Sequence, residues 1–164
     1  MIAGPTSVVH EHHARLMQHV DQIPVTADLL GPASVIEIRE RLDAMYEFLT
    51  ALLIPHMDST ERTLYPELER LMQNRHSMTP MRREHVEIRA LVDDLGRRRA
   101  GLTGDQLSVR DAVALRRSLF RLYCLMKVHL AEERLYGDIG EHGLSADAEA
   151  ALGAAMEHQG IAGS

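Results

Sequence analysis

Ten of the 164 residues are histidine and only one is cysteine, so imidazoles are the side chains best placed to do chemistry. His129 and Glu133 are four residues apart, which puts an imidazole and a carboxylate on one helix face, about one turn from each other. Such a pair can bind one metal ion. His56 and Glu61 form a second pair, but their five-residue spacing separates the side chains by about 140° in a straight helix. A kink near Pro55 could bring both to one axis.

Two further histidines lie on apolar stripes. His13 falls between Val9 and Leu16, and His85 precedes Ile88, at the spacing of a buried helix face. A single histidine in this setting is usually a hydrogen-bonded core residue. Four of them, one on each expected helix, are harder to explain that way, because each one buried without a partner costs about 1–3 kcal/mol. A shared metal removes that cost, so the sequence predicts a metal site.

This set of donors favours a pair of iron ions. Imidazole suits iron, zinc and copper, while carboxylates in a helical bundle can bridge two ions and balance their charge. Four imidazoles, two bridging glutamates and an oxo or hydroxo bridge would fill about ten of the roughly twelve positions of an octahedral pair. The remaining positions stay open for a small ligand. Zinc or a mixed pair would accept the same donors.

The elements that position these residues are helices, because apolar residues recur at three and four throughout and strand-like alternation is missing. We expect helices over residues 6–23, 34–73, 79–100 and 108–139, and a short one over 146–157. The first stops before Pro24, leaving 24–33 as a loop, and the second kinks at Pro55, Pro66 or both. The expected fold is all-α: an antiparallel up-down-up-down four-helix bundle with a short extra C-terminal helix. It forms one domain, 1–164, with the bundle over about 6–139 and a tail over 140–164.

The histidine motifs repeat faintly along the chain. Residues 11–16 (EHHARL) match 83–88 (REHVEI), and residues 55–65 match 128–136. The first and third helices therefore carry one kind of histidine motif, and the second and fourth carry a histidine–glutamate motif.

Composition narrows the class of protein. A net charge of −6, 4% aromatic residues and no tryptophan argue against nucleic acid as a partner. The longest apolar run, 48–54, is too short to span a membrane, and residues 1–7 do not form a secretory signal. The single cysteine, Cys124, has no internal disulfide partner, so we expect a cytoplasmic protein and a buried, inert thiol.

Taken together, the motifs resemble those of the hemerythrin-like family, also called the HHE cation-binding domain. They are Glu11-His12-His13-x-x-Leu16, His56-x4-Glu61-x2-Leu64-Tyr65-Pro66, Arg83-Glu84-His85-x-x-Ile88 and His129-x3-Glu133-x2-Tyr136. The resemblance covers about residues 8–139. It implies a four-helix bundle around a non-haem di-iron centre, and binding or turnover of dioxygen, hydrogen peroxide or nitric oxide, or sensing of iron or oxygen.

The chain also departs from the family pattern. Oxygen-carrying hemerythrins have two histidines four apart in the third helix, and here the earlier position is Met81. The second helix usually has a glutamate four after its histidine, and here that residue is Thr60, with Glu61 next to it. Fewer protein ligands leave more exchangeable positions, which favours peroxide chemistry over reversible oxygen carriage.

Several assignments have alternatives. Tyr65 could bind iron as a phenolate, donate a proton as a catalytic group, or pack in the core, and Tyr136 is expected to pack or support the site. Glu132 competes with Glu133 as a ligand, and His12 competes with His13. The predicted metal ligands are His13, His56, Glu61, His85, His129, Glu133 and Tyr65.

The expected function follows from these residues and the resemblance. It is a di-iron protein that disproportionates hydrogen peroxide, as a catalase- or peroxidase-like oxidoreductase, or that reacts with nitric oxide or dioxygen. An alternative is a sensor or binding module for oxygen, nitric oxide or iron without turnover. A metal-free interaction bundle is a third possibility. The expected partners are these small ligands, with the chain a monomer or homodimer.

Overall fold

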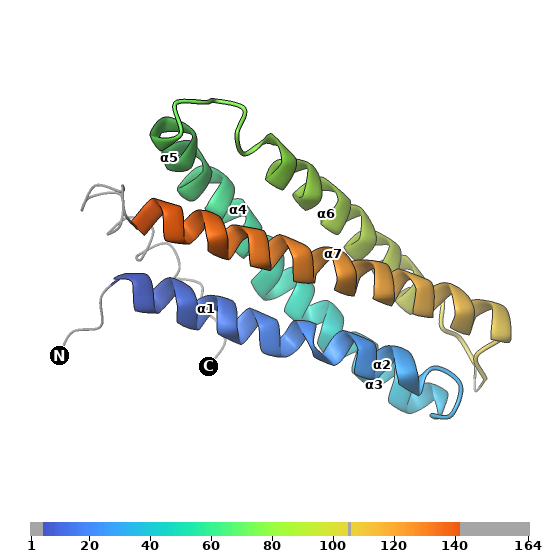
Figure 1. Ribbon diagram of the computed structural model, residues 1–164. Helices are drawn as coiled ribbons and strands as arrows, with labels where there is room; N and C mark the ends of the chain where they lie inside the picture. Colours follow the sequence, from blue (N-terminus) through green and yellow to red (C-terminus); the bar gives the residue numbers. More distant parts are fainter. Residues whose placement is uncertain (1–4, 105, 142–164) are drawn as a thin grey trace.

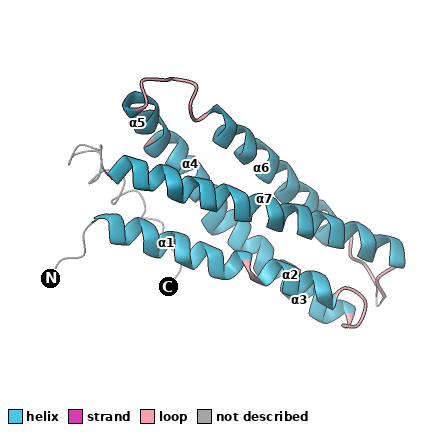
Figure 2. Ribbon diagram, viewed as in Figure 1, coloured by secondary structure: helices cyan, strands magenta, loops and turns pink. Residues whose placement is uncertain are grey.

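A computed structural model describes residues 5–104 and 106–141, and every regular element in these two ranges is a helix (Figure 2). The all-α prediction is therefore confirmed for the described chain. The helix expected over 146–157 lies outside the described residues. Within them, no helix is long and apolar enough to cross a membrane.

The first expected helix is two helices, α1 (Pro5–Val20) and α2 (Gln22–Leu29). The expectation that helix stops before Pro24 is wrong, because Pro24 lies in the first turn of α2. An N–H in a first turn has no partner within the helix, so proline is tolerated there. The loop is correspondingly shorter than 24–33.

The second expected helix runs from the cap Ser34, whose Oγ accepts a hydrogen bond from the N–H of Glu37 at 3.2 Å. It consists of α3 (Val35–Phe48), the π-helix η1 (Leu49–Leu53), α4 (Ile54–Arg62) and α5 (Leu64–Leu71). The wider η1 turn comes just before Pro55, and α4 breaks at Thr63, three residues before Pro66. Each proline would clash with a preceding carbonyl in an unbroken α-helix. The expected interruptions are therefore confirmed at both prolines.

The last two helices match their predictions closely. Helix α6 covers Thr79–Ala100 and is followed by Gly101, and α7 covers Val109–Glu141. The Oγ of Ser108 accepts a hydrogen bond from the N–H of Asp111 at 3.1 Å, which satisfies one of the free N–H groups at the start of α7.

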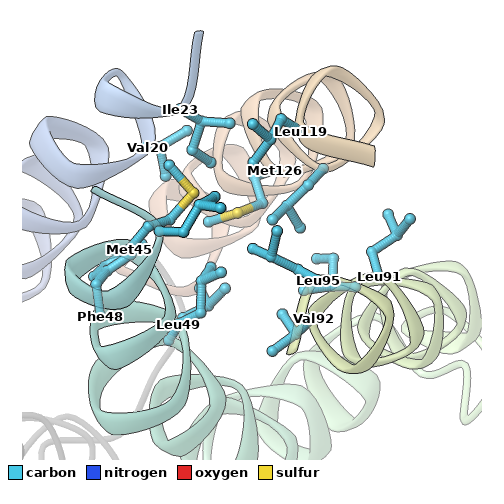
Figure 3. Packing of buried hydrophobic residues seen from close by; sticks show 14 of the residues in the cluster. Val20, Ile23, Met45, Phe48, Leu49, Leu91, Val92, Leu95, Leu119 and Met126 are labelled. Atoms are coloured by element: carbon cyan, nitrogen blue, oxygen red, sulfur yellow. The ribbon is translucent and has the colours of Figure 1, made fainter. Parts of the chain in front are cut away.

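The helices form a bundle in which α7 packs against α6, α1 and α2 (Figure 1). Its main core is made of aliphatic, methionine and phenylalanine side chains from these four helices and from α3, η1 and α4, among them Val20, Leu49, Val92, Leu119 and Met126 (Figure 3). A second, smaller apolar cluster contains Leu64, Tyr65, Leu68, Met78 and Met81. Cys124 is exposed, so the expectation of a buried thiol is wrong.

Candidate metal centre

Four histidines, one each from α1, α4, α6 and α7, converge in the interior of the bundle. His56, His85 and His129 are completely buried, and His13 is 8% exposed. A completely buried carboxylate, Glu133 of α7, lies among them. These are five of the seven residues that the sequence predicted as ligands.

The two oxygens of Glu133 face different neighbours. Oε2 lies 2.9 Å from Nε2 of His56 and 3.3 Å from Nε2 of His13. Oε1 accepts a hydrogen bond of 3.1 Å from the Tyr65 hydroxyl. Glu133 thus belongs to two groups with metal-binding geometry, His13–His56–Glu133 and His85–His129–Glu133, in each of which the donor atoms lie within 4.8 Å of one another. We call these the α1/α4 position and the α6/α7 position.

The α6/α7 position brings two imidazole lone pairs together. Nε2 of His85 lies 3.0 Å from Nε2 of His129. Nδ1–H of His85 donates to Glu61 at 2.6 Å, and Nδ1–H of His129 donates to Glu84 at 2.8 Å. When both imidazoles are neutral and carry their single proton on Nδ1, each Nε2 has a lone pair directed at the other. A cation between them would turn this repulsion into attraction.

The charge states of the site suit metal binding. Burial, followed by the neighbouring His129, lowers the pKa of His85 to about 4, so its imidazole is neutral at pH 7. Burial alone would raise the pKa of Glu133, but His56, His13 and His129 outweigh it and hold that pKa well below its usual range. Neutral imidazole and ionised carboxylate are the forms that bind metals.

Glu61 lies outside both groups. Its carboxylate contacts the Nδ1 side of the His85 ring and also lies 3.8 Å from a guanidinium nitrogen of Arg89. Between His56 and Glu61 helix α4 is regular, so the offset of about 140° persists and no kink corrects it. Thr60, four residues after His56, is the completely buried residue instead. This placement does not support the expectation that Glu61 shares an ion with His56.

Tyr65 lies at the edge of the α6/α7 position. Its hydroxyl is 3.2 Å from Nε2 of His85, in addition to its bond with Glu133. Burial, and then the Glu133 carboxylate, raise the pKa of Tyr65 above the usual range, so the phenol keeps its proton. Met81 is completely buried in the same apolar cluster as Tyr65, and Tyr136 packs against that cluster. Met81, four residues before His85 in α6, therefore places a buried thioether beside the site and no nitrogen donor.

The structure separates the two pairs of competing residues. Nε2 of His13 faces Glu133, whereas Nε2 of His12 lies 3.1 Å from Nδ1 of His56, behind that ring. Burial, followed by His56, lowers the pKa of His12 to about 3. Glu133 is buried in the centre, while its neighbour Glu132 is half-buried and belongs to neither group.

Sequence reasoning missed the role of Glu84. The signal was available, because Glu84 precedes His85 just as His12 precedes His13 in the repeated motif. Its contact with His129 depends on how α6 and α7 pack, which no spacing within α6 reveals.

The residues present fit a metal. Nε2 of His13 is buried without a hydrogen-bond partner, since its 3.3 Å approach to Glu133 lacks hydrogen-bond geometry. Leaving such an atom unsatisfied is costly, and a metal ion would satisfy it. Imidazole nitrogens with a carboxylate suit iron, zinc and copper.

Comparison with known families agrees with this chemistry. The model of the hemerythrin HHE cation-binding domain matches residues 4–134, which include all five converging residues. Domains of this family bind metal cations, typically iron, and small ligands. Comparisons with curated proteins and with solved structures find no match. Because the family match spans most of the sequence, the chain belongs to the hemerythrin family of HHE cation-binding domains.

Proposed function

We propose that this domain binds two iron ions and uses them to react with small oxidants. His13 and His56 would hold one ion, and His85 and His129 would hold the other, with Glu133 bridging between them. The observation that carries this proposal is the 3.0 Å approach of the two Nε2 atoms of His85 and His129, whose other nitrogens are committed to carboxylates. Glu61 would orient His85 rather than bind an ion.

The small number of protein donors supports reactivity over reversible oxygen carriage. Four imidazoles and one bridging carboxylate supply about six of roughly twelve octahedral positions. A second bridging carboxylate from Glu61 would have raised this number by two. The remaining positions are available to water and exogenous ligands.

The reaction we favour is disproportionation of hydrogen peroxide, in which two molecules give two of water and one of dioxygen. Two adjacent irons, when bound, would relay the two electrons that pass from the peroxide molecule that is oxidised to the one that is reduced. Tyr65 holds its proton at the hydroxyl and can donate a hydrogen bond to an oxygen atom close by, while Glu133 stays ionised. Tyr65 could also bind the iron of the α6/α7 position directly.

We further propose a direction for the helices, an extent for the domain and a location for the protein. The helices would run up-down-up-down and antiparallel, in a single cytoplasmic domain with the bundle over about 6–139. Nitric oxide or dioxygen chemistry, or sensing without turnover, remain alternatives that use the same donors.

The decisive experiment is metal analysis with an absorption spectrum, on protein purified aerobically without added metal. We expect two irons per chain and near-ultraviolet oxo-to-iron bands, with a further broad visible band if Tyr65 is a ligand. Peroxide-dependent evolution of dioxygen should be lost in folded His56→Ala and Glu133→Ala variants. Bound iron without turnover would instead favour a sensor, and protein that binds neither iron nor zinc would contradict the metal site itself.

Removing the metal provides a further check. A ligand present at about 100 times its Kd stabilises the folded state by about 2.7 kcal/mol, so chelation should lower the Tm clearly. A metal-free interaction bundle would show no such change.

A further inference from the structure

The two metal positions differ in the residues that contact Nδ1 of their histidines, the ring nitrogen that faces away from the centre of the site. In the α6/α7 position, Nδ1–H of His85 donates to Glu61 and Nδ1–H of His129 donates to Glu84. In the α1/α4 position, Nδ1 of His56 contacts Nε2 of His12 at 3.1 Å. Two carboxylates therefore support one position, and an imidazole supports the other.

In the internal repeat, a histidine occupies the position in α1 that a glutamate occupies in α6. His12 directly precedes His13 in α1, and Glu84 directly precedes His85 in α6. Each crosses to the Nδ1 atom of the histidine on another helix, His12 to His56 and Glu84 to His129. Both halves of the bundle thus have a contact to Nδ1, but the contacting residue is an imidazole in one half and a carboxylate in the other.

The charge matters because of how a histidine binds metal. A carboxylate that accepts the Nδ1–H makes the imidazole a stronger donor through Nε2, and losing such a partner weakens metal affinity by about 10–100-fold. An imidazole in that place brings no negative charge in any protonation state. Arg89 lies 3.8 Å from Glu61 and offsets part of its charge, so Glu84 is the carboxylate to test first.

We propose that the two positions have unequal affinities, with the α6/α7 position binding its ion first and tightly and the α1/α4 position binding second and weakly. Glu61 and Glu84 act as positioning residues for the first, and His12 limits the second. This inference rests on the proposed function, since it presupposes two metal positions.

The test is equilibrium dialysis of the metal-free full chain against Co²⁺, followed by metal analysis and a visible absorption spectrum. The unaltered protein should bind two Co²⁺ ions in separate steps. Glu84→Gln keeps the size and the hydrogen-bond acceptor but removes the charge, so it should weaken the first step by about 10–100-fold and leave the second unchanged. Glu87→Gln is the matched control: it removes the same charge from the same helix, but Glu87 is exposed and pairs with Arg121 at 3.1 Å.

A gain of affinity provides the complementary test. His12→Glu restores a carboxylate behind His56 and should tighten the second step until the two steps approach each other. Circular dichroism establishes whether this variant folds, and if it does not, Glu61→Gln replaces it, with weakening of the first step expected.

Two results would overturn the inference alone: two Co²⁺ ions bound with equal affinity by the unaltered protein, or equal effects of Glu84→Gln and Glu87→Gln. Absence of any Co²⁺ binding by the unaltered protein would overturn the proposed metal site as well.

Discussion

The Tyr65 hydroxyl donates a hydrogen bond of 3.1 Å to Oε1 of Glu133, and both side chains are completely buried. The donor comes from α5 and the acceptor from α7, so this bond ties the short helix after the Thr63 break to the longest helix of the bundle. With Oε2 directed at His56 and His13, the carboxylate is held on both oxygens. Glu133 is therefore held between the two histidine groups and belongs to both of them.

Replacing Glu133 by glutamine should abolish binding at both positions, because the proposed bridge loses its charge while keeping its shape. Metal analysis after loading should fall from two ions per chain to less than one. Glu132→Gln is the control, since Glu132 is the half-buried neighbour outside both groups. Retention of two ions by folded Glu133→Gln protein would contradict the bridging role.

Tyr65→Phe should destabilise the metal-free protein by about 1–3 kcal/mol, because the buried Oε1 of Glu133 loses its donor while the apolar packing of the ring is kept. Urea unfolding measures the difference. Tyr136→Phe, on a partly buried ring packed against the same cluster, should have a smaller effect. Equal free energies of unfolding for Tyr65→Phe and the unaltered protein would contradict this argument.

Leu119→Ala should cost about 2–5 kcal/mol, because Leu119 is completely buried in the main core and its removal leaves a cavity. The metal stoichiometry should not change, since Leu119 lies ten residues before His129 in α7. Val109→Ala, at a side chain 81% exposed in the same helix, should stay within about 0.5 kcal/mol. A similar loss in both variants would argue against this core.

Asp94 provides a test of pH dependence. The hydrogen bond from Arg98 lowers the pKa of Asp94 below the ordinary 3.8, burial opposes this, and a hydrogen bond from Ser118 adds to the lowering. A lowered folded pKa means that the ionised group stabilises the fold above pH 3.8 and that this contribution is lost as the pH falls through the folded value.

Asp94→Asn should therefore cost up to about 1 kcal/mol at pH 7, where the partly exposed pair is screened by solvent, and the difference should disappear at strongly acidic pH. Chemical unfolding at both pH values measures it. Asp93→Asn, which removes the same charge at the exposed neighbouring position, is the control. An Asp94→Asn effect that persists unchanged in acid would show that charge is not its cause.

The sequence predicted the helices best where local chemistry sets their ends. Ser108 accepts a hydrogen bond from the N–H of Asp111 at the start of α7, Pro80 lies in the first turn of α6, and Gly101 follows its last residue. These effects act within one turn, and α6 and α7 match the predicted ranges. The prediction failed at Pro24, where the same residue is compatible with the end of one helix or the first turn of the next. In the structure α2 packs against α7, α3 and α1, and the local sequence around Pro24 does not specify these contacts.

The candidate site divides in the same way. The sequence alone determined that one histidine lies on the inner face of each of four helices and that His129 shares a face with Glu133. Both follow from spacing along a single helix, which the geometry of the helix backbone sets. Tertiary structure alone decided that Glu61 and Glu84 contact His85 and His129 from outside the groups. Those partners lie on neighbouring helices, so the contacts depend on how α4, α6 and α7 pack together, and no periodicity within one helix carries that information.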